Sequence, residues 1–232
     1  MQKKNFDFNS ALSLCNKKFS HNDLIEFLKL GNVVERQFAA LSLESIENEA
    51  EADIFLSNLV GVDGKIREVI ALKLSELTQK NPHLFCFKKN AKILSDATID
   101  IDGNVCRLAI ESAKNLSISE DFSKLYTENL LNIVKTALNE ISKFTFRDKK
   151  YKINKQVFKI YWCLEALAFF YKYLDSDILI DLLTSCSSLS EYTIREKCAN
   201  ILKKIGQNNI NKELFDKLRQ DENYYVRNSI NN

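Results

Sequence analysis

A basic stretch with aromatic residues between its cations is the part of this 232-residue sequence whose residue types are best suited to binding chemistry. From Lys143 to Lys159, seven basic residues stand against Asp148 alone, and four aromatic residues lie among them. Cations interleaved with aromatic rings suit a nucleic-acid backbone and its bases. A charge run on a loop is more often a solvated surface, however. The candidate binding residues are Lys149, Lys150, Lys152, Lys155, Lys159 and Trp162.

The helix predicted after this stretch is apolar on two sides. One face carries Val157, Ile160, Tyr161, Leu164, Leu167, Ala168 and Tyr171 at helical spacing. An aromatic stripe lies roughly opposite and consists of Phe158, Trp162, Phe169 and Tyr173. A helix that is apolar all round is normally buried, and neighbouring helices on both sides would cover this one. If part of the aromatic stripe is exposed instead, it would anchor a binding partner, because Trp and Tyr concentrate interface energy.

Sequence motifs of catalytic and metal sites are absent. The chain has no glycine-rich phosphate-binding loop, no H-E-x-x-H and no G-x-S-x-G. Its two histidines, His21 and His83, each flank a predicted helix without a second metal ligand nearby in sequence. We therefore expect no catalytic residue, no metal and no cofactor, and a protein that is not an enzyme.

The cysteines and the N-terminus indicate a compartment. Six cysteines occur without a C-x-x-C pair, and Cys106, Cys163 and Cys198 lie in apolar helical stretches where a thiol behaves as a small hydrophobic group. The first nineteen residues contain no secretory apolar run, and no window approaches eighteen consecutive apolar residues. These features predict a reducing, cytoplasmic location and no membrane partner.

The elements that would position these residues are helices. Five Gly and one Pro are few for a protein of strands and turns, so the composition favours long helices with short connections. A phrase that leads from a turn into an aliphatic–Arg pair recurs and opens several of them. It ends at Arg67, Arg107, Arg195 and Arg227. Recurrence at intervals of tens of residues indicates stacked helical repeats.

The apolar spacing divides the chain into about six helix pairs within one domain, 1–232. The expected pairs are Asp23–Leu30 with Val34–Leu41, Glu51–Val60 with Ile66–Gln79, Leu84–Ala97 with Val105–Leu116, Phe122–Lys143 with Asn154–Leu174, Asp177–Cys186 with Tyr192–Ile205, and Lys212–Arg219 with Tyr224–Ile230. Residues 1–20 are expected to cap the array, and residues 144–152 to form a longer basic loop.

The recurring phrase resembles the HEAT repeat, a two-helix unit related to the armadillo repeat. That family has an acid in the turn between its helices and a Val-Arg pair at the start of the second helix. The resemblance implies an all-α, right-handed superhelix in which Asp63 with Arg67, Asp102 with Arg107, and Asp221 with Arg227 form a ladder between repeats. Arg36 and Arg195 occupy matching positions. We expect these arginines to be structural, each bound to a turn carboxylate or carbonyl.

A curved repeat scaffold that binds a protein partner through its inner helices is the function predicted first. The alternative is a DNA-binding protein resembling the HEAT-like glycosylases of alkylated bases, with Tyr161, Trp162 and Glu165 as suggestive residue types. The net charge of only +2 argues against nucleic acid. A third reading, a lyase that attaches bilins, has no specific residue in its favour. The oligomeric state stays open.

Overall fold

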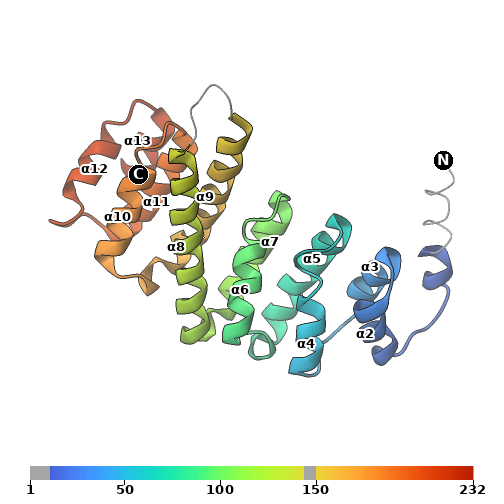
Figure 1. Cartoon of the computed structure of the whole chain (residues 1–232). Coiled ribbons are helices and arrows are strands. Elements are labelled where there is room, and N and C mark those ends of the chain that lie inside the picture. Colours follow the sequence, from blue (N-terminus) through green and yellow to red (C-terminus); the bar gives the residue numbers. More distant parts are fainter. Residues whose placement is uncertain (1–10, 144–149, 232) are drawn as a thin grey trace. The chain divides into compact units, whose positions relative to one another are not determined.

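The computed structural model describes residues 11–143 and 150–231, and within them the regular structure is entirely helical. Residues 11–15 are helical and precede the longer elements shown in Figure 1. These are α2 (His21–Leu30), α3 (Val33–Ser42), α4 (Glu49–Leu56), α5 (Gly64–Lys80), α6 (Lys88–Ala97), α7 (Gly103–Asn115), α8 (Glu120–Ser142), α9 (Lys150–Phe170), α10 (Ser176–Cys186), α11 (Tyr192–Ile205), α12 (Lys212–Arg219) and α13 (Tyr224–Asn231). Short 3₁₀ turns, η1 (Pro82–Leu84), η2 (Leu116–Ile118) and η3 (Tyr171–Tyr173), lie between some of them.

The chain forms two compact units, Met1–Phe122 and Ser123–Asn232, whose boundary falls near the start of α8. In the first unit α2 packs on α3 and α6 on α7, and the second helices α3, α5 and α7 pack on one another. In the second unit α10 packs on α11 and α12 on α13, and α9, α11 and α13 form the corresponding stack. Each unit is therefore a stack of helix pairs, as the sequence predicts. The prediction of one domain over 1–232 stays a prediction.

The helices begin where the sequence supplies capping side chains. Asp63 Oδ1 accepts a hydrogen bond from the Lys65 backbone N–H at 2.9 Å, and Asp102 Oδ1 accepts one from Asn104 at 2.8 Å. Asn32 forms a reciprocal capping box with Glu35 at the start of α3. Each side chain satisfies a backbone donor that the first turn of a helix leaves unpaired. The polar turn residues thus fix where α3, α5 and α7 start, whereas Glu191 before α11 makes no side-chain capping bond.

Apolar side chains pack the two helices of a pair against each other. In the first unit the Phe19 ring lies 5.1 Å from the Phe27 ring and 5.5 Å from the Phe38 ring, so it covers the first helix pair. In the second unit the fully buried rings of Tyr126 on α8 and Phe170 on α9 meet edge to face at 5.0 Å. Burial of an aromatic side chain of this kind contributes about 1.5–3 kcal/mol, so these contacts hold the pairs together.

Two helices start four residues away from the predicted position, and two predicted helices, Glu51–Val60 and Asn154–Leu174, end four residues earlier, at Leu56 and Phe170. Helix α9 begins at Lys150 and not at Asn154, because Ile153 and Val157 continue its helical spacing and no Pro or Gly interrupts it. The basic segment 144–152 is therefore helical from Lys150 onward, and residues 144–149 lie outside the described residues. Helix α6 begins at Lys88 and not at Leu84, because Pro82 starts a separate 3₁₀ turn.

Candidate binding surface

Helix α9 of the second unit has a buried face and a partly exposed aromatic face. Its buried residues are Ile160, Cys163, Leu164, Ala166, Leu167 and Phe170. Phe158 and Trp162 are half-buried, and Phe169 is 39% exposed. At 3.6 residues per turn, these three rings lie on the side of α9 turned away from the centre of its buried face. We call these three residues, together with Lys150, Lys152, Lys155 and Lys159, the α9 surface.

The indole of Trp162 has an unused hydrogen-bond donor. Its ring centroid lies 6.2 Å from that of Phe158 and 5.4 Å from that of Tyr161, both edge to face. Its Nε1 atom is buried and has no hydrogen-bond partner among the described residues. Leaving a buried N–H unpaired costs about 1–3 kcal/mol.

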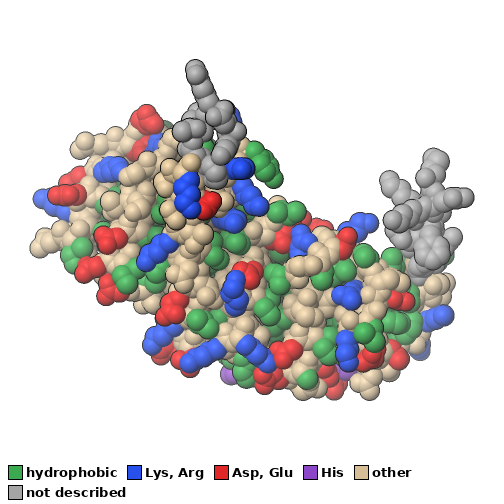
Figure 2. All heavy atoms as spheres, in the orientation of Figure 1, with side chains coloured by type: hydrophobic (Ala, Val, Ile, Leu, Met, Phe, Trp, Pro, Cys, Tyr) green, Lys and Arg blue, Asp and Glu red, His purple; other side chains and the backbone are tan. Residues whose placement is uncertain are grey.

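The cations predicted from the sequence lie on the first turns of α9. Lys150, Lys152 and Lys155 are exposed and Lys159 is half-buried, whereas Lys149 lies outside the described residues. Figure 2 shows Lys and Arg side chains beside hydrophobic ones over this part of the helix. On α8, a hydrogen bond from Lys143 lowers the pKa of Glu140, and the nearby Lys159 charge lowers it further. Lys155 thus lies three residues before the half-buried Phe158, and Lys159 three residues before the half-buried Trp162, on the same helix.

Glu165, the acid of the DNA-glycosylase reading, is engaged in an ion pair between helices. Lys197 Nζ on α11 lies 2.6 Å from Glu165 Oε2 and 4.8 Å from the centre of the Tyr161 ring. Burial of Lys197 opposes its charge, but the hydrogen bond and attraction from Glu165 outweigh burial and raise the pKa of Lys197. The pair joins α9 to α11. The charge of the Glu165 carboxylate is therefore balanced by Lys197, and the ion pair holds α9 against α11.

A histidine–glutamate cluster that the sequence did not reveal joins α2 to α4. His21 Nε2 lies 2.9 Å from Glu51 Oε2 and 4.0 Å from Glu47 Oε1. These three ligand atoms are close enough to hold a metal ion. Glu51 already accepts hydrogen bonds from the Glu47 backbone N–H at 2.9 Å and from Asn48 at 2.8 Å, so protein donors account for its position. Sequence reasoning missed the cluster because thirty positions separate His21 from Glu51.

Arginines that are buried or half-buried join three of the helix pairs to the pair that follows. Arg67 donates from Nε to Asp100 Oδ2 at 2.7 Å and from Nη2 to Oδ1 at 3.2 Å, and Asp100 belongs to the following pair. Arg195 forms the same two bonds to Asp221, at 2.7 and 3.1 Å, and a third bond to the Ser190 carbonyl at 2.7 Å. In the first repeat, Arg36 donates to Asn58 Oδ1 at 3.0 Å. The guanidiniums of these three arginines therefore bind acceptors in the turns between helices.

The pairing of the ladder differs from the family pattern. The carboxylate that binds Arg67 is that of Asp100 and not that of Asp63, because Asp63 caps α5. Asp102 likewise caps α7. Asp221 offers its carboxylate to Arg195 of the preceding pair, while Arg227 donates to the Asp221 and Glu222 carbonyls.

The third repeat has a cysteine in place of the ladder arginine. Arg36, Arg67, Arg195 and Arg227 are each the fourth residue of a second helix, and the fourth residue of α7 is Cys106. Its thiol donates to the Asp100 carbonyl at 3.1 Å, and burial, with the charge of Asp100, raises the pKa of Cys106 to about 12. Arg107 is one position later, roughly 100° around the helix. It is exposed, and its ion-pair partner among the described residues is Glu111, at 3.8 Å on the same helix.

Acid should weaken the second unit through Asp221. Burial alone would raise the pKa of Asp221, but hydrogen bonds from Arg195 and from the Asn223 N–H outweigh burial and lower it. A carboxyl whose folded pKa is lowered contributes stability above its unfolded pKa of about 3.9 and loses it as pH falls through the folded value. We expect the urea midpoint to fall as pH is lowered from about 5 toward 3. If the urea midpoint of Arg195→Ala depends on pH as steeply as that of the wild type, this prediction is wrong.

Two features determine the architecture: the second helices of the pairs stack within each unit, and Arg36, Arg67 and Arg195, at equivalent helix positions, bind the following pair. The chain has a HEAT/armadillo-like helical repeat fold. No family model matches this repeat chain, and no curated protein matches it.

Several solved structures resemble the repeat chain. The complex of CpcE and CpcF of phycocyanin lyase from Nostoc sp. aligns at 17% identity and a TM-score of 0.48, covering 91% of this chain and 74% of that one. A designed armadillo repeat protein aligns at 14% identity and a TM-score of 0.41, covering 91% of this chain and 97% of that one. A HEAT-like repeats protein from Thermococcus onnurineus aligns at 14% identity and a TM-score of 0.37, covering 93% of this chain and 95% of that one. Such identities say nothing about activity, and the fold rests on the ladder and the stacked pairs.

The HEAT-like helices of the described residues do not combine the length and apolarity needed to cross a bilayer. All six cysteines are free, and Cys106, Cys163, Cys186 and Cys198 are buried.

Proposed function

We propose that this HEAT-like repeat chain is a non-enzymatic scaffold that binds a protein partner through its second helices, with the α9 surface as the contact. The observation that carries the proposal is the aromatic stripe on the side of α9 away from its buried face, part of it exposed. Phe169 is 39% exposed, although Phe170 beside it is fully buried. Exposed aromatic residues next to cations are typical of binding surfaces, because they supply contact area at little entropic cost.

The state of the charged residues favours a protein partner over base chemistry on DNA. Glu165 is paired with Lys197, so it is not poised as a free acid. The ladder guanidiniums of Arg67 and Arg195 are bound to carboxylates and carbonyls and are not available to phosphates. Four buried free thiols support a reducing, cytoplasmic location as part of the proposal.

Charge reversal on the α9 surface should abolish partner capture and leave the fold intact. The variant combines Lys152→Glu, Lys155→Glu and Lys159→Glu. Lys152 lies in the first turn of α9, where the helix dipole favours an acid, and Lys155 is exposed. We therefore expect the helicity to be retained and the free energy of unfolding to change by less than about 1 kcal/mol. Capture of the partner should fall at least ~10-fold, equivalent to about 1.4 kcal/mol or more. Affinity capture from extract with quantitative mass spectrometry identifies the partner, and titration of the purified partner, followed by Trp162 fluorescence, measures the affinity.

A matched control separates local contact from overall charge. Lys65→Glu, Lys88→Glu and Lys212→Glu make the same change in charge at exposed positions in the first turns of α5, α6 and α12. This control should keep the partner. Equal loss in both variants would reject the α9 surface as the contact. Tight binding of duplex DNA by the wild type, weakened by the α9 variant, would reject the protein partner and support the nucleic-acid reading.

A further inference from the structure

Three atoms of metal-binding type lie close together in the histidine–glutamate cluster of the first unit. His21 Nε2 lies 2.9 Å from Glu51 Oε2 and 4.0 Å from Glu47 Oε1, and the three atoms lie within 4.8 Å of one another. In a tetrahedral zinc site with bonds of about 2.0–2.2 Å, ligand atoms lie about 3.4 Å apart. The two separations from His21 lie on either side of this value. Small movements of the side chains would therefore suffice to hold a zinc ion.

The Glu51 carboxylate is already oriented by groups other than the histidine. Its side chain is 12% exposed, and it accepts hydrogen bonds from the Glu47 backbone N–H at 2.9 Å and from Asn48 Nδ2 at 2.8 Å. A carboxylate has about four lone-pair sites, so these two bonds leave sites for a metal ion. Carboxylates that bind metals are commonly hydrogen-bonded in this way. The Glu47 side chain is 63% exposed and has room to move toward an ion.

The charges of the cluster favour a divalent cation. Glu47 and Glu51 form no ion pair with a Lys or Arg among the described residues. The neighbouring acids Glu49 and Asp53, in contrast, both bind Lys89. A divalent cation would balance the two negative charges of Glu47 and Glu51, whereas a neutral imidazole balances neither.

The hydrogen bond between His21 and Glu51 occupies the place where such an ion would bind. A nitrogen lone pair would repel a carboxylate oxygen at 2.9 Å, so a proton lies between His21 Nε2 and Glu51 Oε2. Metal ions compete with protons for such ligands, and their binding releases the proton. Zinc brings two positive charges where the proton brings one, so it would attract the Glu47 carboxylate as well.

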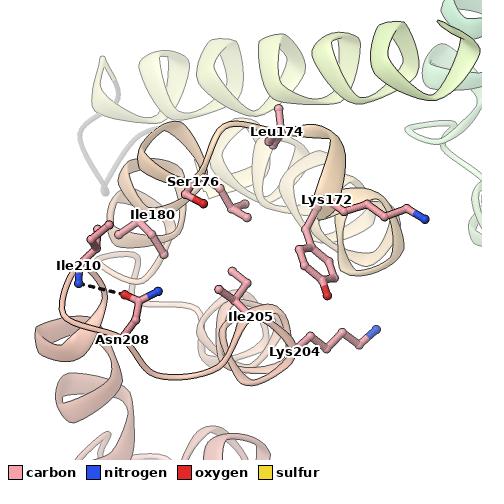
Figure 3. Close-up of a pocket in the computed structure, with 10 residues that line it drawn as sticks. Lys172, Leu174, Ser176, Ile180, Lys204, Ile205, Asn208 and Ile210 are labelled. Carbon is pink, nitrogen blue, oxygen red and sulfur yellow. Dashed lines mark hydrogen bonds between the residues drawn. The ribbon is translucent and has the colours of Figure 1, made fainter. Parts of the chain in front are cut away.

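The cavity of the second unit offers no comparable set of ligands. It has a volume of about 210 Å³ and lies between the start of α10 and the end of α11. In Figure 3 the ammonium groups of Lys172 and Lys204 point away from the space beside Ile180 and Ile205. No acid, histidine or cysteine is among the described residues that line this cavity. The histidine–glutamate cluster is therefore the better candidate for a ligand site.

We propose that His21, Glu47 and Glu51 bind a zinc ion, with water as the fourth ligand, and that the ion joins α2 to α4. One imidazole nitrogen with two carboxylate oxygens suits zinc, whereas Mg²⁺ and Ca²⁺ prefer oxygen ligands alone. Glu51 is thirty positions from His21, beyond the sequence neighbours on which the prediction of no metal depends. The ion would hold the first helix pair against the second. The proposal is independent of the α9 surface, which belongs to the second unit.

The two histidines of the chain make the binding test specific to this site. The probe is Zn²⁺, added to the full chain without an affinity tag, and the imidazole signals are followed by NMR. We expect the signals of His21 to shift and saturate at one equivalent of zinc, while those of the exposed His83 stay unchanged. Zinc bound by cysteine thiols leaves both histidines unchanged. Unchanged His21 signals, equal responses of both histidines, or an equal response to Mg²⁺ would each overturn the proposal.

A pair of matched variants tests the third ligand. Glu47→Gln keeps the hydrogen bond between His21 and Glu51, and its exposed side chain can be changed without disturbing the fold. It should weaken zinc binding at His21 at least ~10-fold, since loss even of a group that only orients a ligand costs about 10–100-fold. Glu44→Gln makes the same change of charge at an exposed position outside the cluster and should bind zinc as the wild type does. Equal zinc affinities of the two variants would show that Glu47 is not a ligand and would overturn the three-ligand site.

Discussion

Replacement of Arg195 by alanine is expected to destabilise the second unit by about 3–5 kcal/mol, because it leaves a buried carboxylate without its cation. The side chains of Arg195 and Asp221 are 8% and 9% exposed, and two hydrogen bonds join them. Two backbone carbonyls, of Leu189 and Ser190, would also lose their donor. The loss is therefore larger than that of a single surface ion pair, which is about 0–1 kcal/mol.

The chain supplies both a probe and a control for this experiment. Trp162 is the only tryptophan and lies on α9, so its fluorescence during urea unfolding reports on the second unit. Arg107→Ala is the matched substitution, since Arg107 follows the ladder position of α7 and is exposed. Because Arg107 lies in the first unit, the unfolding of both variants is also followed by far-UV circular dichroism, which reports on the helices of both units. Arg107→Ala should change stability by less than about 0.5 kcal/mol. Comparable losses for the two variants would show that the ladder does not stabilise the stack.

The positions of the ladder arginines could be predicted from the sequence, but their partners could not. Arg67 follows Asp63 by four residues in the phrase before α5, and this short spacing suggests that the two side chains pair. They do not, because the Asp63 carboxylate caps α5. A carboxylate that caps its own helix points along the first turn, so Arg67 reaches Asp100 of the next pair instead. Asp100 precedes the capping Asp102 by two residues. An acid just before the cap is the sequence signal for the partner.

A one-residue difference in alignment explains why Arg107 was predicted at the ladder position of the third repeat, which Cys106 occupies. Aligned by its aliphatic–Arg pair, Arg107 matches Arg67, but aligned by helix start the matching residue is Cys106. A shift of one residue turns a side chain by roughly 100° about the helix axis, which separates a buried position from an exposed one. Capping residues therefore define the register of these repeats better than the basic residues do.

The candidate surface was predicted by residue type, whereas its exposure depended on packing. Periodicity alone places Phe158, Trp162 and Phe169 opposite the apolar face of α9. Whether neighbours cover that face depends on which side of α9 contacts α11, and the Glu165–Lys197 pair fixes this contact. Lys197 lies thirty-two positions from Glu165, beyond the reach of any local pattern. Long-range pairs of this kind, including His21 with Glu51, could not be predicted from the sequence.

Two adjacent phenylalanines should separate stability from binding. Phe170→Ala removes a fully buried ring that contacts Tyr126 at 5.0 Å, and we expect a loss of about 3–5 kcal/mol in the unfolding free energy of the second unit. Phe169→Ala, one residue earlier and 39% exposed, should cost less than about 1 kcal/mol. Urea unfolding monitored by Trp162 fluorescence measures both changes.

The binding measurement should give the opposite order. Phe169→Ala removes an exposed aromatic residue of the α9 surface, so partner affinity should fall about 10-fold or more while the fold is retained. Phe170→Ala, measured at a temperature where it remains folded, should bind the partner nearly as wild type does, because its ring faces Tyr126 and not the solvent. If Phe169→Ala retains full affinity, the exposed stripe is not the contact, and the second helices must bind elsewhere.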